Sequence, residues 1–362
     1  MKGHENYHIH CRLKELMAQR NITVEELHDL ARVSRETISQ LRSNAFKGVS
    51  AKGIARICGA LSIGIGELFE LLPEDIWLPI RLTKEVTIHF GSRTLSEPHS
   101  ADRGADAAIM SRQFMGTWDF KAFKRISEYL LGLKLDIRIR FELHVTGASR
   151  GIDPAVHASA ERVFAEGNHI VIGSPIANQF TEEVVCHAYN VTPYNPAMRD
   201  ALPYGFQFDP RHQVRSTFAW QGQGKSFGIA ALPSNKIVAP CVIVPSGEGT
   251  DGALILVHRV FRKPSLREVG DDEERVVICL LGYSGPGTCA AAQLSTDPEH
   301  AAGLYPSART VPRMRAVACD YFREPSALKD DNREVTGVRL ISEHKQPRSI
   351  NPNSRSRRAA AR

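Results

Sequence analysis

Residues 34–42 carry a run of polar side chains with the hydrogen-bonding groups that could contact the edges of DNA bases. Ile38 and Leu41 have the spacing of one inward edge of a helix. The positions around them hold small, polar or basic side chains, namely Arg35, Glu36, Thr37, Ser39, Gln40 and Arg42. A helix that buries one edge can present its other side to the DNA major groove. The pattern therefore predicts a DNA-binding module.

The stretch TVEELHDLARVSRETISQLRSN, residues 23–44, must position these side chains. Thr23 is followed three residues later by Glu26, the spacing of a capping box that starts a helix. Apolar residues then recur at helical spacing. Val33 and Ser34 are expected to form a turn, with Ser34 placed to cap the next helix. The stretch therefore predicts two short helices joined by a tight turn.

Three further helices are predicted around this pair. Residues 8–20, 50–61 and 65–72 each repeat apolar positions at helical spacing, and Pro73 ends the last of them. Five short helices that share one set of apolar positions predict a compact all-α domain over residues 8–75.

Roughly residues 9–75 resemble the Cro and phage-repressor helix-turn-helix family, often called the XRE family. The resemblance lies in RLKELMAQRNITVEELHDLARVSRETISQLRSN followed by KGVSAKGIARICGALSIGIGELF. Two positions depart from the family pattern. Arg32 stands where glycine is common, and Val24 where glutamine often contacts a phosphate. Arg32 is therefore expected to adopt a left-handed or nearby backbone conformation.

The resemblance also implies which side chains contact double-stranded DNA. Arg35, Glu36, Thr37 and Gln40 would face base edges, and of these Arg35 suits a bidentate contact to guanine and Gln40 a contact to adenine. Contacts to phosphates would come from Ser34, Ser43, Asn44 and Lys47. One such module contacts only a short half-site, so a homodimer on a palindromic site is expected.

The net charge of +6 is unevenly distributed along the 362 residues. Residues 31–56 hold six Lys or Arg against one acidic residue, whereas residues 1–75 hold ten of each sign. Positive charge in the helical domain is therefore local to the expected DNA face. Residues 343–362 also hold six basic residues against one acidic residue, and this tail is expected to be disordered. It either adds affinity for DNA phosphates or has no role.

The rest of the chain predicts a second, larger domain. Residues 76–109, rich in Ser, Asp, Gly and Ala after residue 90, are expected to be a linker and loop. Residues 110–325 alternate helices with short apolar strands, which predicts a Rossmann-like α/β domain with a mostly parallel or mixed sheet. No apolar run long enough for a membrane helix and no signal-peptide core are present. The protein is therefore expected to be cytoplasmic and to have no membrane partner.

Two strand-to-helix junctions of this domain are candidate ligand sites. In VIGSPIANQFTEE, residues 171–183, the candidates follow the carboxyl end of a strand, where open α/β sheets bind ligands; they are Gly173, Ser174 and Asn178. In LLGYSGPGTCAAA, residues 280–292, glycines would let backbone N–H groups approach an anion at a helix N-terminus; the candidates are Gly282, Gly285, Gly287 and Thr288. Tight turns also need glycine for backbone reasons alone. At both junctions the glycines can therefore be explained without a ligand.

The second domain gives no catalytic or metal-binding pattern. Its histidines are dispersed without H-x-x-x-H or H-E-x-x-H. They include His144, His157, His169, His187, His212 and His258. The seven cysteines of the chain form no C-x-x-C pair, and no Ser-His-Asp arrangement is indicated. No catalytic residue, metal site or cofactor is therefore predicted. The favoured hypothesis is a transcriptional regulator whose second domain senses a small-molecule or nucleotide effector or mediates oligomerisation. The alternative is a nucleotide-binding enzyme or defence-type effector with an autoregulatory helix-turn-helix domain.

Overall fold

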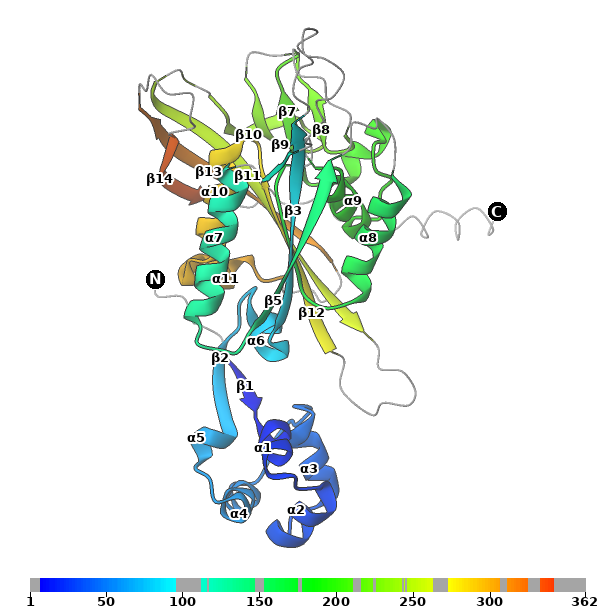
Figure 1. The fold of residues 1–362 in the computed structure, drawn as a ribbon, viewed down its shortest axis with the longest axis vertical. Coiled ribbons are helices and arrows are strands. Elements are labelled where there is room, and N and C mark those ends of the chain that lie inside the picture. The colour runs from blue at the N-terminus through cyan, green and yellow to red at the C-terminus, as the bar shows by residue number, and fades with distance from the viewer. Residues whose placement is uncertain are drawn as a thin grey trace, which may run out of the picture.

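The chain forms a small helical domain followed by a larger domain of mixed sheet and helices (Figure 1). The computed structural model describes residues 7–95, 112–115, 117–146, 153–174, 178–210, 216–223, 226–242, 244, 246–262, 273–306, 311–324 and 333–341. The basic tail, residues 343–362, lies outside the described residues. No helix in the described part of the chain is both long and apolar enough to cross a membrane.

The helical domain contains the five predicted helices around one apolar core. They are α1 (Leu13–Arg20), α2 (Val24–Ala31), α3 (Arg35–Arg42), α4 (Ala51–Leu61) and α5 (Ile65–Leu68). Helical spacing places one apolar edge of each helix inward, and the edges meet in a buried cluster that includes Leu13, Leu27, Ile38, Ile57 and Leu68.

The two ends of this domain differ from the prediction. Strand β1 (Tyr7–Cys11) pairs antiparallel with β2 (Phe69–Pro73), so the first helix does not begin at residue 8 and the fifth does not reach residue 72. In β1 the sequence YHIHC alternates apolar and polar residues, the period of a half-exposed strand. Pairing with β2 satisfies backbone groups that a single turn of helix would leave free.

The larger domain is built on an eight-stranded sheet. Its order is β14–β13–β11–β12–β6–β3–β4, and β5 pairs with the other edge of β3. Four neighbouring strands are parallel, namely β12 (Glu273–Gly282), β6 (His169–Ile172), β3 (Glu85–Leu95) and β5 (Arg138–Thr146). The remaining pairings are antiparallel and involve β4 (Arg112–Met115), β11 (Gly247–Arg262), β13 (Arg313–Arg323) and β14 (Arg333–Leu340). The sheet is therefore mixed, and the parallel pairing expected of a Rossmann-like arrangement is limited to β12, β6, β3 and β5.

Helices cover both faces of this sheet (Figure 1). One apolar cluster joins the sheet to α6 (Leu78–Thr83), α7 (Thr117–Gly132), α10 (Gly285–Ser295) and α11 (Pro298–Leu304). A second cluster joins the other face to α8 (Pro154–Ala165) and α9 (Gln179–Ala188). The same cluster includes a four-stranded sheet, with η1 (Pro196–Ala201) beside it; the strands are β7 (Tyr204–Phe208), β8 (Ala219–Gln221), β9 (Gly228–Ala231) and β10 (Lys236–Pro240).

Residues 76–95 are part of the larger domain, which corrects the predicted linker of 76–109. They form α6 and β3, and the side chains of Ile76, Trp77 and Ile80 are fully buried in the core. Trp77 Nε1 donates a hydrogen bond to the carbonyl of Ser295 at 2.8 Å. Burial of these apolar side chains outweighs the loop-like composition that follows them. Residues 96–109 are outside the described chain. At the other end, β14 extends the sheet beyond the predicted boundary at residue 325.

Candidate functional site

Helices α2 and α3 each begin at a capping residue that the sequence contains. Glu26 N donates to Thr23 Oγ1 at 3.2 Å and Thr23 N donates to Glu26 Oε2 at 2.8 Å, which completes a capping box. Arg32 ends α2 with a left-handed φ of 52°, as expected from its place in the motif. Ser34 Oγ accepts a hydrogen bond from Thr37 N at 3.2 Å and so caps α3. These local contacts fix where α2 begins and ends and where α3 begins.

Helix α3 buries one edge and exposes the other. Ile38 and Leu41 are fully buried, whereas Arg35, Glu36 and Gln40 are exposed. Gln40 Nε2 donates to Glu36 Oε1 at 3.3 Å, which aligns these two side chains along the outer face. Thr37 is half-buried, and its hydroxyl lies 2.8 Å from Ser34 Oγ. The outer face therefore offers one guanidinium, one carboxylate and one amide in a row.

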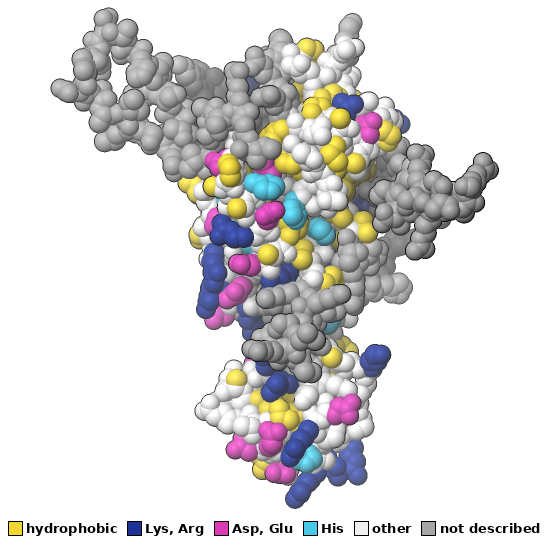
Figure 2. All heavy atoms as spheres, turned by 90° about the vertical axis from the view of Figure 1, so that its right-hand side faces the viewer, with side chains coloured by type: hydrophobic (Ala, Val, Ile, Leu, Met, Phe, Trp, Pro, Cys, Tyr) yellow, Lys and Arg dark blue, Asp and Glu magenta, His cyan; other side chains and the backbone are white. Residues whose placement is uncertain are grey.

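The four residues expected at phosphates have different surroundings. Ser34 and Lys47 are exposed, and Figure 2 shows Lys and Arg side chains gathered at the free end of the helical domain. Ser43 Oγ donates to the carbonyl of Ser39 at 2.9 Å. The amide of Asn44 bonds the backbone of Cys11 twice, accepting from its N–H at 2.6 Å and donating to its carbonyl at 3.2 Å. Asn44 therefore fastens the end of α3 to β1.

The family model of a Cro/C1-type helix-turn-helix DNA-binding domain matches residues 12–74. These residues form a Cro/C1-type domain. The match covers the five helices and the whole of β2, and it ends where the larger domain begins. No curated protein matches the chain.

Beyond the Cro/C1-type domain, the two predicted junctions lie side by side, because they follow neighbouring parallel strands. Gly173 N donates to the carbonyl of Leu280 at 3.1 Å. Gly173 has a φ of 127°, so it needs the conformational freedom of glycine. Ser174 is half-buried, and Asn178 caps α9 by accepting from Phe180 N at 3.0 Å. The buried Asn178 Nδ2 has no hydrogen-bond partner within the described part of the chain.

An acidic side chain of the protein itself lies at the second junction. Asp251, on β11, accepts hydrogen bonds from Gly287 N at 2.8 Å, Ser284 Oγ at 2.6 Å and Gly252 N at 2.8 Å. Its carboxylate therefore occupies the N-terminal end of α10, where a bound anion was expected. Burial raises the pKa of Asp251 above its ordinary value, and these hydrogen bonds oppose the rise.

Close packing explains the glycines of this junction. A Cβ on Gly287 would lie 2.2 Å from the carbonyl oxygen of Gly252, and a Cβ on Gly282 would lie 2.4 Å from the Thr288 nitrogen. A Cβ on Gly285 would lie 2.1 Å from Trp118 Cδ1. The geometry thus favours the simpler interpretation, in which these positions need glycine for space rather than for a ligand.

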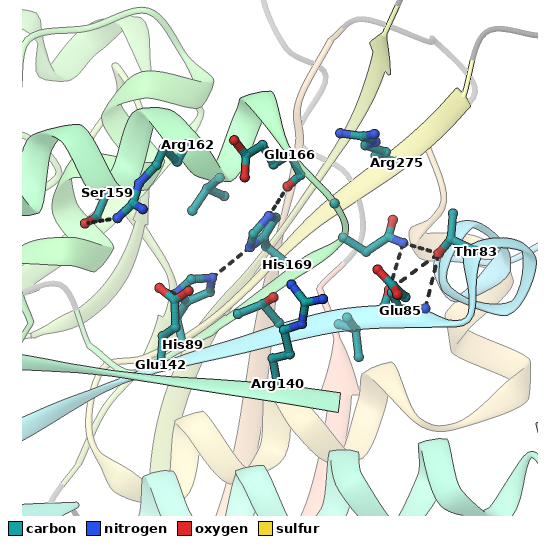
Figure 3. A pocket seen from close by; sticks show the side chains of 15 residues that line it. Thr83, Glu85, His89, Arg140, Glu142, Ser159, Arg162, Glu166, His169 and Arg275 are labelled. Carbon is teal, nitrogen blue, oxygen red and sulfur yellow. Dashed lines mark hydrogen bonds and ion pairs between the residues drawn. The ribbon is translucent and has the colours of Figure 1, made fainter. Parts of the chain in front are cut away.

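A cavity of about 290 Å³ lies at the opposite, amino-terminal end of the parallel strands (Figure 3). Helix α8 and the loop that follows it form one wall, and the starts of β3, β5 and β6 form the other. Charged side chains of both signs line it, namely Glu85, Glu142, Glu166, Arg140, Arg162 and Arg275. Figure 2 shows histidine, acidic and basic side chains close together on this side of the larger domain. The cavity is therefore suited to a polar occupant.

Three histidines from adjacent strands form a chain of ring contacts beside the cavity. His89 on β3 has Nε2 2.8 Å from His169 Nδ1 on β6, and Nδ1 3.0 Å from His144 Nε2 on β5. Burial lowers the pKa of His89 to about 2 and that of His144 to about 4, and it also lowers the pKa of His169. At neutral pH all three rings are therefore neutral, and each carries one N–H and one lone pair.

The contacts fix which nitrogen of each ring carries the proton. His169 Nε2 contacts the carbonyl oxygen of Glu166, which can only accept, so this nitrogen carries the hydrogen. His169 Nδ1 then accepts from His89 Nε2–H. The remaining nitrogen, His89 Nδ1, presents its lone pair toward His144 Nε2 and toward Glu142 Oε2 at 3.5 Å. His89 Nδ1 therefore accepts a hydrogen bond from His144 Nε2–H and also lies next to a carboxylate.

The sequence prediction placed His144 and His169 among dispersed histidines and did not predict their cluster with His89. His89 and Glu142 are directly opposite each other in the β3–β5 register, and Thr87 is opposite His169 in the β3–β6 register. Since side chains two residues apart share a face, His144 joins the same face as Glu142. The alternation within each strand was visible in the sequence, but the order of the strands was not.

Proposed function

We propose that this chain is a sequence-specific transcriptional regulator. A Cro/C1-type domain supports a DNA-binding regulator in general terms. Sequence specificity is supported mainly by the outer face of α3, where Arg35, Glu36 and Gln40 are exposed. The opposite edge of the same helix is buried in the domain core. Arg35 binds guanine through two parallel N–H donors, and Gln40 hydrogen-bonds to adenine. Ser34, Ser43 and Lys47 contact phosphates, and Asn44 keeps α3 in place against β1.

The proposed DNA-binding form is a homodimer, because one helix-turn-helix module contacts only a short half-site. The β1–β2 ribbon supports this proposal. Ile9 and Leu71 are cross-strand partners and are 50% and 64% exposed, which places apolar surface beside the Cro/C1-type domain. A second copy of the chain packed on this ribbon would remove that surface from water.

The larger domain is proposed to sense a polar small molecule in the histidine-lined cavity. Helix α6 supports a connection between this cavity and the DNA-binding domain. Thr83, the last residue of α6, and Glu85, the first residue of β3, line the cavity. The other end of α6 follows directly from β2 through the buried residues Asp75 to Trp77. A ligand that shifts α6 would therefore shift the attachment of the Cro/C1-type domain.

Selection of bound sequences from random double-stranded DNA by the full-length protein tests the regulator proposal. We expect an enriched palindrome whose half-sites are one helical turn apart, about 10 base pairs. Arg35→Ala should relax the preference at one base position, at a cost of about 1–3 kcal/mol against the preferred base. Lys47→Ala is the matched control, because loss of a phosphate contact weakens binding to all sequences alike. Equal weakening by Arg35→Ala on every sequence would contradict the base contact.

The histidine cavity also supports the second candidate, a nucleotide-binding enzyme or effector that carries an autoregulatory DNA-binding domain. Neutral imidazoles beside a polar cavity are groups that transfer protons in many enzymes. Incubating the full-length protein with a panel of nucleotides separates the two functions. Turnover favours the enzyme, whereas binding without turnover favours the sensor.

A further inference from the structure

We infer that His89, His144 and Glu142 bind a divalent first-row transition-metal ion beside the histidine-lined cavity. This site rests on side-chain geometry in the larger domain and does not depend on the proposed role in DNA regulation. Within the described chain, no other group of three His, Cys, Asp or Glu side chains meets the same spacing.

The distances between the three ligand atoms fit one coordination sphere. His89 Nδ1 lies 3.0 Å from His144 Nε2 and 3.5 Å from Glu142 Oε2, and all three atoms lie within 4.8 Å of one another. Metal–ligand distances of about 2.1 Å place neighbouring ligand atoms about 3.0–3.4 Å apart in octahedral or tetrahedral sites. An ion can therefore contact all three atoms after small side-chain rotations and a shift of the His144 proton from Nε2 to Nδ1.

The protonation pattern of the histidine chain prepares His89 as a ligand. His169, held through Nε2 by the carbonyl of Glu166, accepts the Nε2–H of His89. This contact leaves the lone pair on His89 Nδ1, the nitrogen that faces Glu142. Metal-bound histidines usually donate their second N–H to a neighbouring acceptor, which orients the ring and raises its basicity. His169 is thus a positioning residue for the metal site.

The burial of the ligands also suits a metal site with an entry route. His89 is 2% exposed and lies beside Phe180, with ring centroids 4.9 Å apart, whereas the side chain of Glu142 is 51% exposed. An ion can therefore reach the carboxylate from solvent and settle against the fixed imidazole.

Two histidines and one carboxylate leave further coordination positions open, unlike the four protein ligands of a structural zinc site. The cavity beside the site is lined by Arg140 and Arg162, whose guanidinium groups favour an anionic ligand in those open positions.

Titration of the full-length protein with Co²⁺, after stripping with a chelator, tests this assignment. We expect one Co²⁺ per chain with a visible ligand-field absorption band. Glu142→Gln and His144→Ala should each abolish the stoichiometric band. His169→Gln should weaken Co²⁺ binding about 10–100-fold, as for other residues that orient a ligand. Glu85→Gln is the matched control, because Glu85 also lines the cavity, from the start of β3, but is not a ligand, and it should leave the band unchanged.

Thermal unfolding of each metal-free variant, followed by circular dichroism, shows whether the fold is retained. Should His144→Ala unfold, Glu142→Gln decides the question, because this exposed side chain can change without loss of core packing. The inference is overturned if the wild-type protein takes up no Co²⁺. It is also overturned if Glu142→Gln and Glu85→Gln have the same affinity for Co²⁺, because a purely structural histidine cluster would give that result.

Discussion

Replacing Arg81 with leucine should destabilise the larger domain by about 3–5 kcal/mol, the usual cost of breaking a buried ion pair from one side. Arg81 Nη1 and Nη2 donate to the two carboxylate oxygens of Asp75 at 2.7 and 3.0 Å. The side chains are only 5% and 6% exposed. Nη2 also donates to Tyr129 Oη at 2.9 Å, and Nη1 to the carbonyl of Pro73 at 3.2 Å. The substitution leaves the Asp75 carboxylate buried with the Trp77 N–H as its remaining donor.

An exposed pair provides the matched control for this measurement. Arg138 Nη1 lies 3.0 Å from Glu85 Oε1, but the two side chains are 68% and 50% exposed. Arg138→Leu should therefore cost less than about 1 kcal/mol, because solvent already stabilises both charges. At about 2–4 °C per kcal/mol for a domain of this size, Arg81→Leu should lower the melting temperature by roughly 6–20 °C.

Thermal and urea unfolding of the full-length protein, followed by circular dichroism, measures both variants. The double variant Asp75→Leu with Arg81→Leu should regain much of the lost stability, because apolar residues often replace a buried ion pair at little cost. Equal destabilisation by Arg81→Leu and Arg138→Leu would contradict a special cost of breaking the buried pair. A double variant less stable than Arg81→Leu alone would contradict the cost assigned to the unpaired Asp75 carboxylate.

Three smaller perturbations test the other structural assignments. Ser34→Ala removes the cap of α3 and should cost about 1 kcal/mol in urea unfolding while weakening binding to all DNA sequences in gel-shift assays. Gly287→Ala places a Cβ 2.2 Å from the Gly252 carbonyl and should cost about 1–3 kcal/mol, whereas Gly48→Ala, with open space around it, should be near neutral in the same unfolding assay. Leu71→Glu adds a charge to the exposed ribbon and should shift the full-length protein from dimer to monomer in light scattering. An unchanged mass would exclude this ribbon as the dimer interface.

The helix-turn-helix pair was predictable because its signals are local. The Thr23–Glu26 capping box and the Ser34 cap each join residues three positions apart, so the sequence alone contains both partners. The end of this domain was not predictable in the same way. Residues 69–73 have apolar spacing compatible with a helix, but they pair with β1, about 60 residues earlier in the chain. A long-range partner thus overrides a short local pattern.

The candidate sites of the larger domain were likewise predictable where their signals are local and not predictable where they depend on distant residues. The strand-to-helix junctions at Gly173 and Gly287 were found from glycine and strand signals within a few residues. What lies at each junction depends on distant residues, since the carboxylate at the second comes from Asp251, 36 positions from Gly287. The histidine cluster depends wholly on strand order. His89 and His169 are 80 residues apart, and only the parallel pairing of β3 with β6 brings their rings together.

Asn168 ties the wall of the cavity to the helix that leads to the DNA-binding domain. It is 1% exposed, and its Nδ2 donates to Thr83 Oγ1 at 2.6 Å and to the carbonyl of Glu85 at 3.0 Å. Its Oδ1 accepts from Val276 N at 2.9 Å on the neighbouring strand β12. One side chain therefore links the end of α6, the start of β3 and the sheet. If α6 has two positions, a cavity ligand can shift the balance between them only when it binds one more tightly than the other. The resulting change in DNA affinity cannot exceed that difference in ligand affinity. Because Asn168 lines the cavity and bonds Thr83 at the end of α6, the proposed ligand would act directly on the helix whose position must differ.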